Sequence, residues 1–256
     1  MARANLQVRK LLCVAALIGG FAVSACAPTS TPEQREALAE TRDPIEPFNR
    51  GVFEVNKGLD TLVFKPLAWW YRLALPDPVQ DSVRNFLANL RLPWSAVNST
   101  MQGEWAQLQT TVVRFAINST LGIAGLFDPA TDWGYAQHEE DFGLTMAKTF
   151  GVGEGFYLVL PIYGPSNVRD AVGLLVDSVA DPVNLALNAY GVGYLTTVRG
   201  GVSGIDQRSR NLETIDQLEK SSVDFYATIR SIYRQRRENE IRGSDPTSNF
   251  PSFGVY

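Results

Sequence analysis

The chain has 256 residues, of which 45% are hydrophobic, 20% charged and 11% aromatic. This length and apolar content predict one globular domain of about 200 residues with appendages, and they exclude wholesale disorder. A formal net charge of −4 disfavours a nucleic-acid binder, the single histidine, His138, excludes a multi-histidine metal centre, and Cys13 and Cys26 are too few to form a disulfide framework.

The first 26 residues have the layout of a bacterial export signal. Basic residues precede an uncharged run at 11–25, which is shorter than the ~20 residues of a membrane-spanning helix. The run ends in Val23-Ser24-Ala25-Cys26, which resembles the lipobox of bacterial lipoproteins, where the cysteine is lipidated and becomes the mature N-terminus. We predict a lipoprotein signal peptide at 1–25 and lipid attachment at Cys26. An ordinary secretory signal that contains a cysteine is the alternative.

Lipid attachment would fix both location and charge. One acyl chain holds a protein weakly, at about 0.8 kcal/mol per buried CH₂, whereas several chains make attachment effectively permanent. Ala27 stands where aspartate would favour the inner membrane, so by resemblance to the general sorting rule we expect the outer membrane. Removing 1–25 takes away three basic residues and no acidic one, so the mature chain carries −7.

The mature chain begins with a tether and continues as amphipathic helices. Residues 26–42 are polar and lack aromatic side chains, and we interpret them as a lipidated tether that contains a short helix. Apolar residues then recur at helical spacing in 81–91, 104–119 and 169–180, and 185–190 continues the helical pattern beyond Pro182.

The longest helical pattern covers 205–242, which contains neither glycine nor proline and predicts one helix of about 30 residues, about 45 Å long. Few segments alternate with period two, and Pro161 interrupts the best of them, 157–162. We therefore predict an all-α domain over 43–241 and a flexible C-terminal tail over 242–256.

Apolar segments of the mature chain are too short to cross a bilayer, since none reaches 18 uncharged residues. The segment 67–75 nevertheless gathers Trp69, Trp70 and Tyr71 beside Arg72. Tryptophan and tyrosine favour the headgroup level of a membrane, where one edge of the ring stays wet. We predict contact with the membrane interface for this segment, with packing in a core as the alternative.

Catalytic and metal-binding motifs are missing from the sequence. The nucleophile motif G-x-S-x-G is absent, and the segment around Ser203, which comes nearest to it, is one residue too short. The zinc-binding motif H-E-x-x-H is absent as well. His138 precedes three carboxylates, but a solvated loop or a helix start explains that run more simply. No cluster has metal-ligand spacing. We predict a protein that is not an enzyme and that has no metal and no cofactor apart from the lipid on Cys26.

Glycine and proline are concentrated in an apolar segment at 150–165. The residues are Gly151, Gly153, Gly155, Pro161, Gly164 and Pro165. A bent, weakly charged apolar segment is unfavourable in water and favourable beside acyl chains. A buried hairpin explains the same pattern, and the residues alone leave both interpretations open.

Three blocks of the sequence resemble the MlaA (VacJ) family of lipoproteins. The first, at 43–50, reads D-P-I-E-P-F-N-R and is similar to the family's opening D-P-x-E-x-F-N-R. The second begins at 114–120 and continues with glycines and an aspartate up to 128, and the third runs from the glycines at 151 to Asp170. The blocks follow the family's order behind a lipobox and cover roughly 43–222.

The resemblance implies an all-α, ring-shaped bundle of amphipathic helices with a central amphipathic channel. Such a ring would lie in the inner leaflet of the Gram-negative outer membrane and face the periplasm. It would remove mislocalised phospholipids from the outer leaflet, pass them to a soluble periplasmic phospholipid-carrier protein, and associate with a trimeric outer-membrane porin. A hydrated groove makes this role physically intelligible, because a headgroup drawn through hydrocarbon loses its water while the tails can stay in apolar surroundings.

Two sets of residues are candidates for this function. We predict that 151–165 bends beside the channel and gates it, with Tyr157 at the lipid interface. The gating set is Gly151, Gly153, Gly155, Tyr157, Leu160, Pro161, Gly164 and Pro165. The set that braces the ring or lines the headgroup path is Phe48, Asn49, Arg50, Asn118 and Arg169. Structural ion pairs explain Arg50 and Arg169 equally well.

Two other functions are compatible with the sequence. A non-transporting envelope scaffold would share the anchor, the acidity and the amphipathic helices, but it would need no lipid-accessible channel. A lipid-modifying enzyme would depend on Ser203 or His138.

Overall fold

The computed structural model describes residues 42–243, which belong to one compact unit that begins at Arg42. The predicted signal peptide at 1–25, Cys26, the tether up to 41 and the tail from 244 onward lie outside the described residues. These assignments stay predictions.

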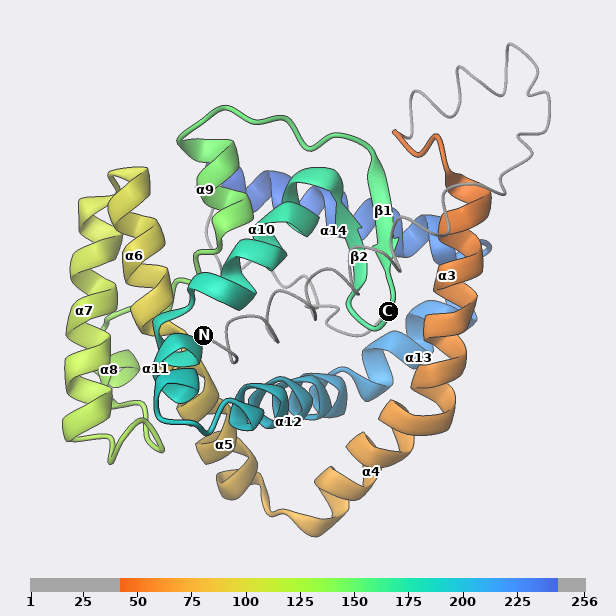
Figure 1. The fold of residues 1–256 in the computed structure, drawn as a ribbon. Coiled ribbons are helices and arrows are strands. Elements are labelled where there is room, and N and C mark those ends of the chain that lie inside the picture. Colours follow the sequence, from red (N-terminus) through yellow and green to blue (C-terminus); the bar gives the residue numbers. More distant parts are fainter. Residues whose placement is uncertain (1–41, 244–256) are drawn as a thin grey trace. The chain divides into compact units, whose positions relative to one another are not determined.

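The described unit is all-α apart from one short hairpin (Figure 1). The helical elements are α3 (Glu46–Leu59), the π-helix η1 (Asp60–Phe64), α4 (Lys65–Ala74), α5 (Asp77–Asn89), α6 (Leu92–Gln102), α7 (Trp105–Thr120), α8 (Pro129–Asp132), α9 (Phe142–Lys148), α10 (Val168–Ala180), α11 (Pro182–Ala189), α12 (Tyr194–Arg210), α13 (Leu212–Ser221) and α14 (Phe225–Arg242). The strands are β1 (Tyr157–Leu160) and β2 (Gly164–Asn167). In Figure 1, α3 and α4 run along one edge of the unit, and α6 and α7 pair along the opposite edge.

Prolines and capping side chains set the starts of many helices. A proline in the first turn is tolerated because its missing N–H would have no partner inside the helix. Such prolines are Pro47, Pro66, Pro78, Pro93, Pro129 and Pro182. Asp141, Asn167 and Asp224 cap α9, α10 and α14, each accepting a hydrogen bond from the N–H three residues on.

The helices predicted at 81–91, 104–119 and 169–180 are confirmed as α5, α7 and α10, and 185–190 overlaps α11. The single helix predicted over 205–242 is wrong. The chain leaves helical geometry at Asn211 (φ −102°, ψ 12°) and again at Ser222 (φ −81°, ψ 134°), so α12, α13 and α14 replace it. Residue spacing misleads here because Ile215 of α13 and Ile229 of α14 enter the same core from two helices.

The segment 150–165 contains the buried hairpin that the sequence offered as an alternative. Strands β1 and β2 pair antiparallel, with Tyr157 opposite Asn167 and Leu160 opposite Gly164. The turn between them holds Ile162 at φ +69°, and β2 begins at Gly164 with φ +82°. Pro161 therefore ends the first strand at a turn rather than breaking a strand in its middle.

Two asparagines of α3 bind the outer edge of the hairpin. Asn49 donates from Nδ2 to the carbonyl of Tyr157 (3.0 Å) and accepts from the N–H of Val159 (3.0 Å). Asn56, two turns further along the helix, donates to the carbonyl of Leu160 (2.9 Å) and accepts from the N–H of Ile162 (2.9 Å). These side-chain amides replace the peptide groups of a missing third strand, so the edge of the sheet is paired.

A compact apolar core lies behind this edge. It joins the first described helix, the hairpin and the last two helices through Phe53, Tyr157, Val159, Ile215, Phe225, Tyr226 and Ile229. The ring of Phe53 meets that of Tyr226 edge-on at 5.5 Å. The core therefore fixes α14 relative to the hairpin, and the site described next lies between these two elements.

Candidate functional site

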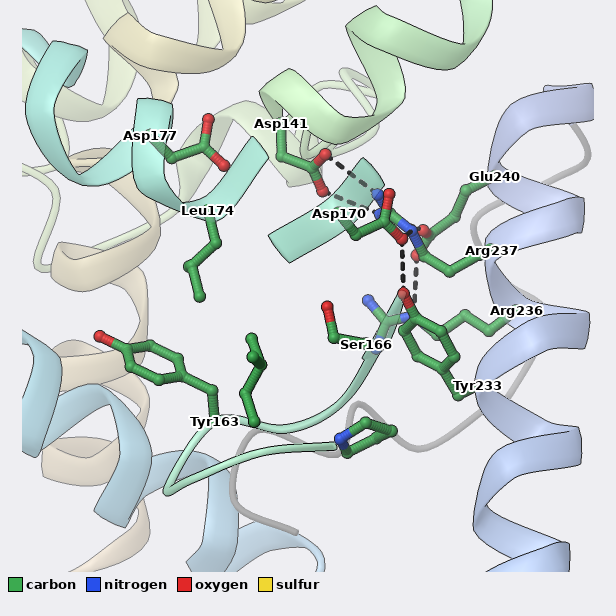
Figure 2. A pocket seen from close by; sticks show the side chains of 12 residues that line it. Asp141, Tyr163, Ser166, Asp170, Leu174, Asp177, Tyr233, Arg236, Arg237 and Glu240 are labelled. Atoms are coloured by element: carbon green, nitrogen blue, oxygen red, sulfur yellow. Dashed lines mark hydrogen bonds and ion pairs between the residues drawn. The ribbon is translucent and has the colours of Figure 1, made fainter. Parts of the chain in front are cut away.

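A cavity of about 220 Å³ lies between the hairpin, α10 and α14 (Figure 2). We call it the hairpin cavity. Its lining consists of Leu160, Tyr163, Pro165 and Ser166 from the hairpin, Asp170, Leu174 and Asp177 from α10, Tyr233, Arg236, Arg237 and Glu240 from α14, and Asp141 at the start of α9. Polar side chains of both charge signs thus meet apolar ones in a single small space.

Arg237 joins three elements at one end of the hairpin cavity. Its guanidinium donates to Asp141 (2.8 Å), to Asp170 (2.7 Å) and to Glu240 (2.9 Å) (Figure 2). Burial alone would raise the pKa of Asp141 and of Asp170, but the charge of Arg237 lowers both to below the ordinary value. Three carboxylates of the lining therefore share the cation Arg237, and Arg169 and Arg236 add a second pair to Asp170 and to Glu240.

Close backbone packing brings these groups together. A Cβ on Gly173 of α10 would stand 2.5 Å from the backbone nitrogen of Gly143, so glycine lets α9 approach α10. A Cβ on Gly143 would stand 2.7 Å from Asp170 and 2.9 Å from Arg237. The two glycines leave the space that the ion pairs occupy.

Asp177 differs from the other carboxylates of the cavity because it makes no ion pair with any residue of the described unit. Its Oδ1 accepts from the indole N–H of Trp94 (2.7 Å) and from the backbone N–H of Phe142 (3.0 Å). Burial, together with the nearby charge of Asp141, raises the pKa of Asp177 to about 6. The second oxygen, Oδ2, accepts no hydrogen bond from the described residues.

Arg236 provides a cation whose donors are largely unused. Its Nε donates to Glu240 (2.7 Å), whereas its terminal nitrogens make no hydrogen bond to any described residue. Figure 2 shows the side chain extending from α14 toward Ser166. The hairpin cavity thus presents one carboxylate oxygen and one guanidinium edge that the described chain does not satisfy.

The second functional feature is the distribution of apolar side chains over the described unit. Among residues 42–243, 33 large hydrophobic side chains are exposed and 13 hydrophobic residues are buried, while 22 polar or charged residues are buried. Water-soluble domains show the opposite preference. We call the exposed set the apolar surface. It includes Trp69 and Trp70 on α4 and Trp105, Val112 and Phe115 on α7.

The exposure of Trp69 and Trp70, at 54% and 60%, excludes the core packing that was the alternative for segment 67–75. Their rings meet edge-on at 5.2 Å and form one exposed aromatic pair. Among the described residues, no helix is long and apolar enough to cross a membrane.

The gating set is divided by the structure. Leu160 and Pro165 line the hairpin cavity, Pro161 begins the turn beside it, and Gly164 begins β2. Gly151, Gly153 and Gly155 lie in the loop that precedes β1. The placement of Tyr157 at a lipid interface is wrong: the side chain is 1% exposed, because its position in β1 points it into the apolar core beside Tyr226.

The bracing set is held mainly by internal contacts. Asn49 is fully buried against the hairpin, Arg50 pairs with Glu46 and Asp224, and Arg169 is buried beside Asp170, so both arginines occupy structural ion pairs. Asn118 donates to Asp128 (2.8 Å) and accepts from the N–H of Ala130 (3.2 Å), which fixes the turn after α7. Phe48 is 44% exposed and belongs to the apolar surface.

The sequence analysis missed Asp177, Arg236 and Arg237. Arg236 and Arg237 lie in the segment 205–242, which was predicted only as one long helix, and no motif links them to Asp177 on α10. Among the described residues there is no group of three or more histidine, cysteine or acidic side chains that could hold a metal ion. Ser203 accepts a hydrogen bond from Arg91 (2.9 Å).

Comparison with known proteins gives these features a family context. The family model described as MlaA lipoprotein matches residues 41–240. An uncharacterized protein of Rickettsia bellii is 39% identical over 208 residues, which are 79% of this chain and 78% of that protein. The intermembrane phospholipid transport system lipoprotein MlaA of Escherichia coli is 32% identical over 243 residues, which are 92% of this chain and 91% of that protein.

The described fold also has a counterpart among solved structures. A chain from work on the structural basis for maintenance of bacterial outer membrane lipid asymmetry matches with a TM-score of 0.68 and 32% identity. The match covers 78% of this chain and 98% of that chain.

Proposed function

This chain belongs to the MlaA lipoprotein family, and we propose from this premise that it removes mislocalised phospholipids from the outer leaflet of the outer membrane and thereby maintains lipid asymmetry. It is a lipoprotein of intermembrane phospholipid transport, and its relatives of that name match it over nine-tenths of both chains. The finer steps of this transport, namely a central amphipathic channel and the transfer of lipid to a soluble periplasmic carrier, are part of the proposal.

The observation that carries the proposal is the inverted distribution of polarity. Exposed apolar side chains are unfavourable in water by about 25 cal/mol per Å², so the apolar surface needs an apolar partner, and acyl chains supply one. Buried polar residues can at the same time support a hydrated path, because a headgroup that keeps hydrogen-bond partners avoids most of the cost of desolvation. Such a body suits a lipoprotein that lies in one leaflet.

The proposed environment rests on membership of the MlaA lipoprotein family. We place the body in the inner leaflet of the outer membrane, facing the periplasm and anchored through lipid on Cys26. We assign it a trimeric outer-membrane porin and a soluble periplasmic phospholipid carrier as protein partners. The proposed role is transport without catalysis, and it requires no cofactor or metal beyond the anchor lipid.

The first test replaces Trp69 and Trp70 of the apolar surface. In cells that lack this protein, the doubly substituted Trp69→Glu, Trp70→Glu chain is expected to leave surface-exposed phospholipid high, because each carboxylate costs on the order of 2–3 kcal/mol in a membrane. The wild type and the matched control Trp69→Phe, Trp70→Phe are expected to restore a low level. Full restoration by the glutamate variant at normal protein level would refute membrane contact through α4.

The anchor is tested in the same cells. Cys26→Ala removes the lipid attachment site and is expected to fail in restoring asymmetry, because the apolar surface alone would then have to hold the body in the leaflet. The matched control is Cys13→Ala, which lies in the predicted signal peptide and leaves Cys26 intact.

The gating prediction is sharpened by the geometry of the loop before β1. Gly155 has φ +72°, and a Cβ there would stand 3.0 Å from Val168, whereas Gly153 faces open space. Gly155→Ala is therefore expected to displace the hairpin and to raise surface-exposed phospholipid, and Gly153→Ala is its matched control with little effect. Equal phospholipid levels in both variants and in wild-type cells would speak against gating by this segment.

A further inference from the structure

The hairpin cavity holds one carboxylate without an ion pair, Asp177, and one guanidinium, Arg236, whose terminal nitrogens are unused among the described residues although its Nε pairs with Glu240. Asp141 and Asp170 share Arg237, Asp170 also pairs with Arg169, and Glu240 pairs with both Arg236 and Arg237, so each of these three carboxylates has a cation inside the protein. Asp177 receives only two neutral donors, both at Oδ1, and the terminal nitrogens of Arg236 receive no acceptor from the described residues. A partly buried carboxylate without a cation is unfavourable, and a bound cation would relieve that cost.

The free oxygen of Asp177 and the free donors of Arg236 together match the two ends of a zwitterion. A primary ammonium donates three hydrogen bonds and suits a carboxylate oxygen such as Oδ2 of Asp177. A phosphate accepts from the flat edge of a guanidinium such as that of Arg236. Leu160, Pro165 and Leu174 line the same space and offer apolar contact to methylene groups between the two charges.

The size of the space limits what it can hold. A volume of about 220 Å³ is smaller than the ~300–1,000 Å³ of sites that enclose whole drug-sized ligands. It accommodates a small polar group, while acyl chains would have to remain outside. Tyr163 lies at the rim, since it lines the cavity and is 60% exposed.

We propose that the hairpin cavity binds the headgroup of a zwitterionic aminophospholipid, with the primary ammonium on Asp177 and the phosphate on Arg236. This assignment rests on the proposed function and adds to it a preference for the headgroup. An anionic phospholipid with a glycerol headgroup satisfies only Arg236 and brings its negative charge near Asp177. The site therefore favours ethanolamine over glycerol headgroups.

The test captures lipid at two exposed tyrosines of the full-length lipoprotein. Tyr163→p-benzoylphenylalanine reports on the rim of the cavity, and Tyr190→p-benzoylphenylalanine, at a residue that is 85% exposed and does not line the cavity, reports on surrounding lipid. The protein is reconstituted in vesicles of equimolar phosphatidylethanolamine and phosphatidylglycerol, and each adduct is identified by its mass. We expect the ethanolamine-to-glycerol ratio to be about threefold higher at 163 than at 190, the factor that one partly exposed ion pair supplies.

Two cavity variants separate the two charges. Asp177→Asn keeps an acceptor for Trp94 and is expected to bring the ratio at 163 down to that at 190. Arg236→Gln is expected to reduce adducts of both lipids at 163 and to leave their ratio unchanged, because both lipids carry the phosphate. Asp132→Asn, at an exposed residue of α8 outside the cavity, is the matched control and is expected to change neither quantity.

The outcomes distinguish this inference from the proposed function. Equal ratios at 163 and 190 in the wild type, or an unchanged ratio in Asp177→Asn, overturn the headgroup assignment while phospholipid transport stands. A lack of phospholipid adducts at both positions contradicts both. Soluble phosphoethanolamine in place of vesicles is expected to give no adduct, and its capture at 163 would overturn the lipid as the source of the headgroup.

Discussion

Replacing Arg208 with methionine is expected to lower the free energy of unfolding by about 3–5 kcal/mol, the cost of leaving one partner of a buried ion pair without its counter-charge. Arg208 of α12 donates from Nε to Asp60 (2.7 Å) and from Nη2 to the second oxygen of the same carboxylate (2.9 Å). Both side chains are 2% exposed. Asp60 begins the π-helix η1, so the pair fixes the point where α3 passes into α4 against α12.

Chemical unfolding of the purified lipoprotein in detergent, followed by far-UV circular dichroism, measures this effect. The matched control is Arg84→Met, which breaks a pair with Asp81 at 41% and 53% exposure and is expected to cost less than about 1 kcal/mol. The double variant Asp60→Asn, Arg208→Met is expected to recover part of the loss, because it leaves no unbalanced charge. If Arg208→Met were as stable as the control Arg84→Met, the ion pair between Asp60 and Arg208 would not be a buried, stabilising one.

Features that depend on residues close together in the sequence were predicted, and features that depend on residues far apart in the sequence were missed. The helices α5, α7 and α10 were predictable, because apolar residues three and four apart mark one helical face within a single segment. The break at 222–224 was not, since neither glycine nor proline marks it, and Asp224 acts as a cap only once the chain has turned there. The residue pattern matches the backbone geometry in the three predicted helices, whereas at 222–224 it does not reveal the break.

The candidate site shows the same division more sharply. The D-P-x-E-x-F-N-R block identified Asn49, but its partners in β1 lie 108 and 110 residues further along the chain, and no spacing rule connects them. Asp177 and Arg236 come from separate helices and line one cavity through the close approach of α9 to α10 and the docking of α14 on the core. Residue types alone therefore suggested a membrane-facing lipoprotein, while the charged cavity required the tertiary arrangement.

Arg237→Gln is expected to lower the free energy of unfolding at pH 7 by about 3 kcal/mol, because Asp141 and Asp170 lose their shared cation and Asp170, unlike the partly exposed Asp141, is mostly buried. Arg237 itself is 12% exposed, and Asp170 is 10% exposed. Arg169 still pairs with Asp170 in the variant. The loss of free energy of unfolding is therefore smaller than if Asp170 had no cation left.

The pH dependence of this loss identifies its cause. In the wild type the pKa of both carboxylates lies below the ordinary 3.8, so their contribution to stability is complete above that pH and is lost only as pH falls through the folded-state pKa. Without Arg237, the largest opposing charge to burial is gone, so the pKa of both groups is expected to rise from its wild-type position even though Arg169 remains. As pH falls from 7 to 4, protonation of Asp141 and Asp170 removes the negative charge that Arg237 no longer compensates in the variant. The difference in free energy of unfolding between variant and wild type is therefore expected to shrink.

Unfolding of both proteins at pH 7 and pH 4 measures that difference. Asp177, with its pKa raised to about 6, titrates in both proteins, so the comparison largely removes its contribution. Arg242→Gln is the matched control, because its pair with Glu238 is exposed at 67% and 61% and should contribute little at either pH. A difference that stays constant or grows on acidification would show that Arg237 acts through packing rather than through charge. The ion pairs would then not be what holds α9 and α10 against α14.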